Sequence, residues 1–137
     1  MSNNWVDDIE TMQDKFGTLD WIFDNKKDKE KLKTFLEFRI NFIQEELDET
    51  KKAFETLDGE ELVDGLIDLC VVAIGTLDAF GVDAYKAWDE VLKANMSKKV
   101  GIKEGRPNPL GLPDLMKPED WKAPSHAGNH GIFNDIR

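Results

Sequence analysis

All five prolines of this 137-residue chain lie in its last third, from Pro107 to Pro124. Proline removes a backbone hydrogen-bond donor and disrupts the interior of a helix, so a long proline-free stretch is what a helical body requires. Apolar residues recur in that stretch at spacings of three and four, and strand-like alternation is absent. We therefore predict an all-α fold, a bundle of four to five helices over residues 1–100, followed by an irregular arm that contains proline and glycine over residues 101–137.

Four helices are indicated by the spacing of apolar residues and by the residues that stop helices. They are expected over residues 5–16, 28–57, 60–80 and 83–96. Asp58 and Glu61 have the three-residue spacing of a capping box at the start of the third helix. Residues 19–25 are predicted to form a loop that carries apolar side chains.

The distribution of charge and of cysteine excludes some classes of function. Residues 1–96 carry 11 Lys and Arg against 23 Asp and Glu, a net charge of −12, whereas residues 97–137 carry 7 against 5, a net charge of +2. An acidic body disfavours binding to a nucleic-acid polymer, and no apolar run approaches the length of a membrane span. The single cysteine, Cys70, excludes an internal disulfide, and the N-terminus lacks the pattern of a signal peptide. These features predict a cytoplasmic protein.

Charged residues interrupt the apolar face of the helix expected over residues 28–57. On a helical wheel that advances about 100° per residue, Arg39 and Glu46 fall in the middle of the apolar arc. Glu49 falls inside the same arc, and Glu45 falls at its edge. These four side chains are therefore placed where a helix normally packs against its neighbours.

The helix expected over residues 60–80 shows the same anomaly. It is apolar over most of its circumference, yet Glu61, Asp64 and Asp68 share one narrow stripe at spacings of three and four. Gly75 continues that stripe without a side chain and leaves room for a bulky group. A helix that is apolar nearly all round is expected at the centre of an assembly, so we predict a homodimer or homotetramer.

Two facing helices that both turn acids inward need compensating cations. Like charges at these spacings repel, and a buried carboxylate without a partner is costly. The available ligands are all oxygens, which favours Mg²⁺, with Mn²⁺ as a substitute, over zinc. The alternative is a solvated acidic face, in which Glu61 only completes a helix cap and Asp64 only complements the helix dipole.

Two sequence motifs carry a resemblance to a known group of enzymes. Residues 45–49 read E-E-x-x-E and residues 61–64 read E-x-x-D. With Phe38-Arg39 before them and residues 95–98 (N-M-S-K) after them, they resemble the MazG-like all-α nucleoside triphosphate pyrophosphohydrolases, which include dimeric dUTPases and phosphoribosyl-ATP pyrophosphohydrolase. The resemblance covers roughly residues 5–100. It implies that a (d)NTP is hydrolysed to a nucleoside monophosphate and pyrophosphate, and it supports the expected homo-oligomer.

The same resemblance implies roles for the acids. It assigns Glu46, Glu49, Glu61 and Asp64 to the metal, while Glu45 and Glu46 are the candidates for catalysis. Glu45 would orient or deprotonate the attacking water, although the division of roles between these two residues stays open. Only 11 residues separate Glu49 from Glu61, which is short for the family and makes Asp68 a possible substitute ligand.

Four residues are candidates for contact with the substrate, namely Arg39, Asp68, Asn95 and Lys98. Each of three has an alternative. Asn95 could satisfy a backbone carbonyl, Lys98 could complement the helix dipole, and Arg39 could form an ion pair with Glu46 or Glu49.

Other functions stay open at this point. Within the class, the chain could be a dedicated dUTPase or a phosphoribosyl-ATP pyrophosphohydrolase. From other classes, it could be a non-catalytic helical adaptor or a metal-dependent phosphatase or nuclease, and the acidic body disfavours the nuclease.

Overall fold

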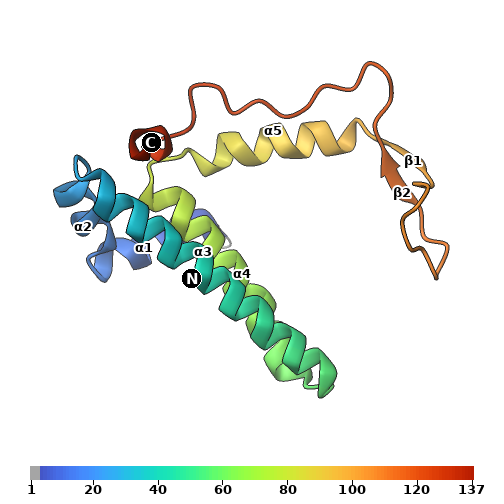
Figure 1. Ribbon diagram of the computed structural model, residues 1–137, viewed down its shortest axis with the longest axis horizontal. Coiled ribbons are helices and arrows are strands. Elements are labelled where there is room, and N and C mark those ends of the chain that lie inside the picture. The colour runs from blue at the N-terminus through green and yellow to red at the C-terminus, as the bar shows by residue number, and fades with distance from the viewer. Residues whose placement is uncertain (1–3) are drawn as a thin grey trace. The chain divides into compact units, whose positions relative to one another are not determined.

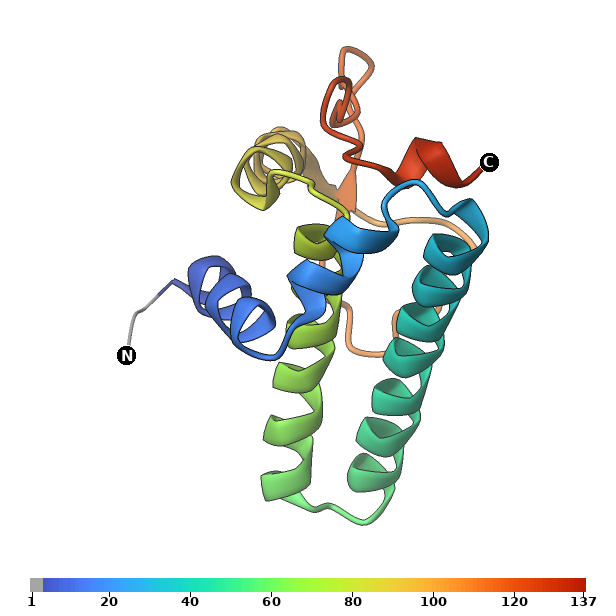
Figure 2. The same ribbon diagram turned by 90° about the vertical axis from the view of Figure 1, so that its left-hand side faces the viewer.

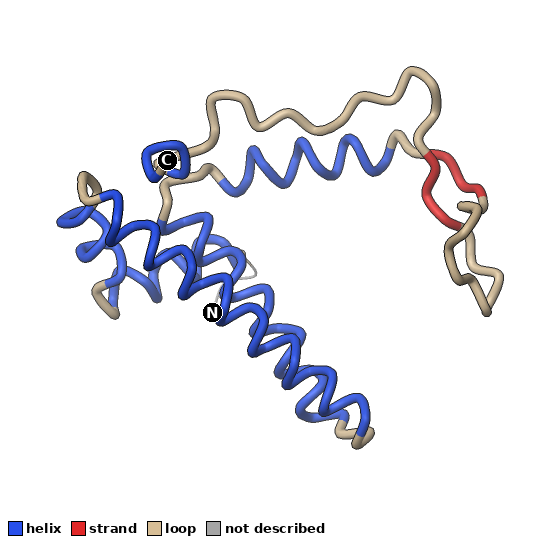
Figure 3. Tube along the Cα trace, in the orientation of Figure 1, coloured by secondary structure: helices blue, strands red, loops and turns tan. Residues whose placement is uncertain are grey.

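The computed structural model describes residues 4–137. Its elements in chain order are α1 (Trp5–Lys15), α2 (Thr18–Asn25), α3 (Lys29–Glu55), α4 (Gly59–Ala79), α5 (Ala84–Met96), β1 (Lys99–Gly101), β2 (Asp114–Met116) and the 3-10 helix η1 (Phe133–Ile136). Helices dominate the described chain, as Figure 3 shows, and the predicted all-α fold is confirmed. The chain forms two compact units: a first unit that runs to Ala84 and resumes at His130, and a second unit, Tyr85–Asn129.

The first unit is built on an antiparallel pair of long helices. Helices α3 and α4 run side by side and are joined by the short turn at residues 56–58 (Figure 2). Leu57 takes a left-handed conformation in that turn, with φ 54°, and the Asp58 carboxylate accepts from the Glu61 N–H at 3.2 Å. The Asp58 half of the predicted capping box is therefore confirmed, whereas the Asp58 N–H donates to the Ala53 carbonyl at 2.9 Å instead of to the Glu61 side chain. The predicted ranges of both helices agree with the structure to within two residues.

Helix α2 corrects one prediction. Residues 19–25 were predicted to be a loop, but Thr18–Asn25 form a helix of eight residues. Gly17 ends α1 in the left-handed conformation, with φ 82°, and lets the chain begin a new helix at once. So short a helix gives little periodic signal, and burial of Ile22 in the core holds it in place.

The core of the first unit lies where α2, α3 and α4 meet, and the C-terminal segment completes it. Leu32 and Phe80 are fully buried there. The Phe133 ring of η1 stacks on Phe80 with centroids 4.4 Å apart, and the Ile132 N–H donates to the Phe80 carbonyl at 2.8 Å. Gly131 makes this approach possible, because a Cβ atom there would overlap the same carbonyl oxygen.

The second unit consists of α5 and the chain that follows it. Strands β1 and β2 pair antiparallel with Val100 opposite Leu115, and the chain then returns alongside α5 (Figure 1). The Trp121 indole donates to the Ala94 carbonyl at 2.8 Å and fixes this return. The sequence did not predict the strands. The boundary expected at residue 100 lies inside this unit, and the division into a domain and an arm stays a prediction.

Over residues 4–137, no single helix is both long enough and apolar enough to cross a membrane. Helices α4 and α5 have the length and apolar composition of a span only when they are counted together, across the bend between them.

Candidate functional site

The candidate site begins where α3 and α4 approach each other closely. Gly65 of α4 is buried against Thr50 of α3, and a Cβ atom at residue 65 would overlap the Thr50 hydroxyl. That hydroxyl donates to the carbonyl of Glu46, one turn earlier in α3, at 2.7 Å. A glycine and a buried threonine therefore bring the two backbones together beside the acidic residues.

Glu46 is the electrostatic centre of the acidic cluster. Burial raises the pKa of its carboxyl above the ordinary value of 4.5, and the negative charges of Glu49, Asp68, Asp64 and Glu45 raise this pKa further, in that order. Two of these four acids belong to α3 and two belong to α4. The structure thus brings together five of the predicted acids across the helix pair.

None of the described Lys and Arg side chains forms an ion pair with these acids. Among the described residues, the buried Oε2 atom of Glu46 has no hydrogen-bond partner. A carboxylate oxygen that is buried, unpartnered and surrounded by acids fits a divalent cation with oxygen ligands. Within residues 4–137, however, no three Asp, Glu, His or Cys side chains lie close enough to one another to hold a metal ion.

Glu61 stands apart from the other predicted ligands. Its side chain is exposed in the first turn of α4, and its backbone N–H takes part in the cap made by Asp58. Its charge is not among those that raise the pKa of Glu46, whereas the charge of Asp68 is the second largest contribution from a neighbour. The arrangement favours Asp68 over Glu61 as a partner of Glu46.

Arg39 faces a polar network rather than the acids. Its guanidinium donates to Gln13 Oε1 at 3.3 Å, and Gln13 donates in turn to Asp78 Oδ2 at 2.6 Å. Burial lowers the pKa of Arg39 and raises that of Asp78, and the hydrogen bond from Gln13 opposes the second shift. The ion pair with Glu46 or Glu49, which was the alternative role for Arg39, is not formed among the described residues.

The room predicted beside Gly75 is occupied by the protein itself. A Cβ atom at residue 75 would lie 2.7 Å from Gln13 Oε1 and 3.5 Å from Arg39 Nη1. Gln13 was missed as a candidate, although it is only 3% exposed. Its position could have indicated a buried polar contact, because Gln13 lies four positions after Ile9 on the apolar side of the first helix.

The remaining substrate candidates belong to the second unit. Asn95 is exposed on α5, and Lys98 follows the helix with its ammonium 5.4 Å from the centre of the Trp121 ring. Their roles toward the acids of the first unit stay predictions.

Comparison with known proteins adds one finding. The model of a single protein family, described as phosphoribosyl-ATP pyrophosphohydrolase, matches residues 18–95. The match includes the helix pair, Glu46 and the four acids around it. No curated protein and no solved structure matches the chain.

Proposed function

Because the chain belongs to the phosphoribosyl-ATP pyrophosphohydrolase family, one of the MazG-like all-α nucleoside triphosphate pyrophosphohydrolases, we propose that it hydrolyses a nucleoside or deoxynucleoside triphosphate to the monophosphate and pyrophosphate. The family supports a pyrophosphohydrolase activity in general. The proposal adds the substrate, the residues that act on it and a role in controlling a nucleotide pool.

The observation that carries the proposal is the buried, unpartnered Oε2 atom of Glu46 among four further acids. A triphosphate is itself strongly negative, so it can enter this cluster only together with cations. Bound Mg²⁺, or Mn²⁺ in its place, would neutralise both partners and lower the pKa of a water molecule. This requirement for a metal links the acidity of the site to the chemistry of the substrate.

The side chains of the cluster have distinct proposed roles. Glu46, Glu49 and Asp64 hold the metal, with Asp68 or Glu61 as a further ligand. Glu45 lies at the exposed edge of the cluster and orients the attacking water or accepts its proton.

Three further residues are proposed to contact the substrate. Arg39, Asn95 and Lys98 offer a guanidinium, an amide and an ammonium group, each of which can donate hydrogen bonds to phosphate oxygens. We also propose that the protein acts in the cytoplasm.

We also propose that the enzyme is a homodimer or homotetramer. On α4, Val63, Leu66 and Ile67 are 66%, 54% and 43% exposed, although this helix also forms the acidic cluster. Neighbouring large apolar side chains left in water are typical of a surface that another protein copy covers. Light scattering on the purified protein tests this, and a stable monomer at micromolar concentration would contradict it.

A product assay tests the reaction. The protein is incubated with each NTP and dNTP, with dUTP and with phosphoribosyl-ATP, in Mg²⁺ or in EDTA, and the nucleotides, pyrophosphate and orthophosphate are resolved. We expect a monophosphate and pyrophosphate in Mg²⁺ alone, and the preferred substrate separates a general (d)NTP enzyme from a dUTPase or a phosphoribosyl-ATP enzyme. Release of orthophosphate together with a nucleoside diphosphate would indicate a phosphatase.

Variants connect the activity to the cluster. Glu46→Gln and Asp64→Asn should each lower kcat by at least about 100-fold, because they remove charge at the metal. Glu37→Gln is the matched control, since Glu37 is an exposed acid of α3 outside the cluster. Absence of turnover with every nucleotide, in Mg²⁺ and in Mn²⁺, would instead favour the non-catalytic adaptor.

A further inference from the structure

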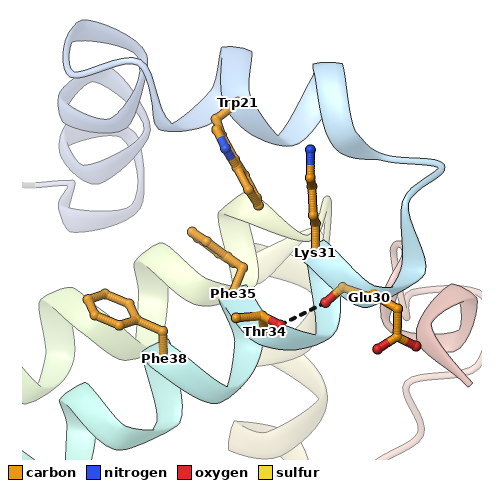
Figure 4. A pocket seen from close by; sticks show the side chains of 6 residues that line it. All are labelled: Trp21, Glu30, Lys31, Thr34, Phe35 and Phe38. Carbon is orange, nitrogen blue, oxygen red and sulfur yellow. Dashed lines mark hydrogen bonds between the residues drawn. The ribbon is translucent and has the colours of Figure 1, made fainter.

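An aromatic pocket opens between α2 and α3, away from the acidic cluster. It has a volume of about 490 Å³ and is lined by Trp21 from α2 and by Glu30, Lys31, Thr34, Phe35 and Phe38 from α3. Figure 4 shows the side chains that line the pocket, with the Trp21 ring stacked on Phe35 and with Phe38 farther along α3. Its lining surface is mostly apolar, and the Thr34 hydroxyl is already engaged with the Glu30 carbonyl at 2.9 Å. Such walls fit a flat apolar group better than a phosphate.

The aromatic rings of the pocket pack partly against the core of the first unit and remain partly exposed to solvent. Trp21 stacks on Phe35 with ring centroids 5.3 Å apart, and Phe35 packs in turn against the buried Phe80 at 5.9 Å. Trp21 and Phe38 nevertheless remain 38% and 62% exposed. Aromatic faces that are fixed on one side and open on the other are suited to stacking with a planar ring from solution.

The pocket lies on the same face of α3 as two acids of the candidate site. Residues 31, 34, 38, 42, 45 and 49 follow one another at spacings of three and four, which places them along one stripe of a helix. Phe38 contacts Phe42 edge-on along this stripe, with centroids 6.3 Å apart. Glu45 is seven positions after Phe38, which corresponds to about 10 Å along the helix axis. A ligand with a flat ring at one end and a charged chain at the other can therefore span both places.

We propose that the pocket between α2 and α3 binds the base of the nucleotide, with Trp21 and Phe38 stacking on it while the phosphates extend along α3 toward Glu45 and Glu49. This inference rests on the proposed function, since it uses a nucleotide as the substrate. Helix α2 contributes no residue to the acidic cluster, and in this proposal it helps to bind the base.

Binding without turnover tests the inference. The Glu46→Gln protein in EDTA is titrated by calorimetry with the four deoxynucleoside monophosphates and with 2-deoxyribose 5-phosphate, which has no base. We expect at least one nucleotide to bind and the sugar phosphate to bind more weakly. Adding Phe38→Ala should weaken nucleotide binding about 5- to 150-fold, the range for loss of one stacked base, and Phe38→Tyr should restore it.

Two controls locate the bound base. Phe54 lies on the same helix and is 64% exposed, close to the 62% of Phe38, so Phe54→Ala should leave nucleotide affinity unchanged. Nucleotide should quench tryptophan fluorescence, and Trp21→Phe should remove that quenching while Trp88→Phe keeps it.

The inference is overturned if Phe38→Ala and Phe54→Ala bind nucleotide equally well, or if the sugar phosphate binds as tightly as the nucleotides. Because no hydrolysis is needed, these outcomes are separate from the product assay. Nucleotide binding that depends on Phe38, in a protein that releases no pyrophosphate, would support the pocket and contradict the proposed reaction.

Discussion

Gly65 of α4 faces Thr50 of α3 so closely that a Cβ atom at residue 65 would overlap the threonine hydroxyl. Thr50 is only 8% exposed, and its hydroxyl donates to the carbonyl of Glu46. The separation of the two helices at this point therefore sets how near Glu46 lies to the acids of α4. Packing and electrostatics are coupled at one pair of small residues.

Gly65→Ala should destabilise the protein by about 1–3 kcal/mol, because the added methyl group forces α3 and α4 apart. Gly59→Ala is the control, since a Cβ atom at residue 59 would meet no atom within 4 Å, and the change should be neutral or stabilising by up to about 1 kcal/mol. Urea denaturation measures both. Thr50→Ala should recover part of the loss in the double variant. Equal stabilities of the two single variants would show that the helices are not in close contact at residue 65.

Gln13→Leu should cost about 1–3 kcal/mol in the free energy of unfolding. Gln13 is buried and donates to Asp78 at 2.6 Å, so its loss leaves a partly buried carboxylate without this donor. Gln44→Leu removes the exposed hydrogen bond to Asp48, which is 2.9 Å long, and should change stability by less than about 0.5 kcal/mol. Thermal or urea unfolding of the two variants compares them. A smaller loss for Gln13→Leu than for Gln44→Leu would rule out a structural role for the buried network.

Mg²⁺ should raise the melting temperature of the wild-type protein. A ligand that binds only the folded state stabilises it by about 2.7 kcal/mol at 100 times its dissociation constant. The shift should be lost in Glu46→Gln and retained in Glu37→Gln, and differential scanning fluorimetry with and without EDTA measures it. The same shift in all three proteins would place the metal away from the acidic cluster.

The metal-free protein should become less stable as the pH rises through the folded-state pKa of Glu46. Burial and neighbouring acids raise this pKa above 4.5, so the folded protein retains the proton at pH values where the unfolded chain has released it. The contribution is therefore fully present below about pH 4.5 and is lost above the raised value. Glu46→Gln should be more stable than wild type at pH 7, and the difference should shrink toward pH 4.5. A difference that grows as the pH falls would contradict the direction of the shift.

Phe133→Ala should destabilise the first unit by about 2–4 kcal/mol, since the half-buried ring stacks on the fully buried Phe80. The matched change is Phe23→Ala, because Phe23 is 66% exposed and the Lys26 ammonium lies over its ring, 4.2 Å from the ring centre. That change should cost less than about 1 kcal/mol. Chemical denaturation of both variants is the measurement. Similar losses would mean that the C-terminal segment does not complete the core.

Helical periodicity predicted most of the fold because α1, α3, α4 and α5 are long enough to repeat their apolar residues several times. It missed α2, whose eight residues make barely two turns. It also missed β1 and β2, which have three residues each, and the docking of Phe133, which depends on a contact with Phe80 far away in the sequence. Such contacts arise from the tertiary structure and leave no local pattern.

The candidate site was predicted in part for the same reason. The positions of Glu46 and Asp68 on the apolar sides of their helices indicated acids that face inward, and the structure brings their charges together. The space beside Gly75 suggested a ligand, but the sequence could not reveal that Gln13 would come from α1 to fill it. The catalytic, metal and substrate roles of all the candidate residues, including Glu45, Glu46, Arg39 and Asp68, stay predictions.

The stacking of Phe133 on Phe80 also bears on the order in which the protein is made and folds. The two residues are 53 positions apart, and the ribosome delivers the residues of α1 to α4 well before those of η1. Until residue 133 has been synthesised, the apolar surface around Phe80 that Phe133 later covers stays exposed on the nascent helices. We expect this chain to gain its full cooperativity only after Phe133 has been synthesised and has closed this long-range contact.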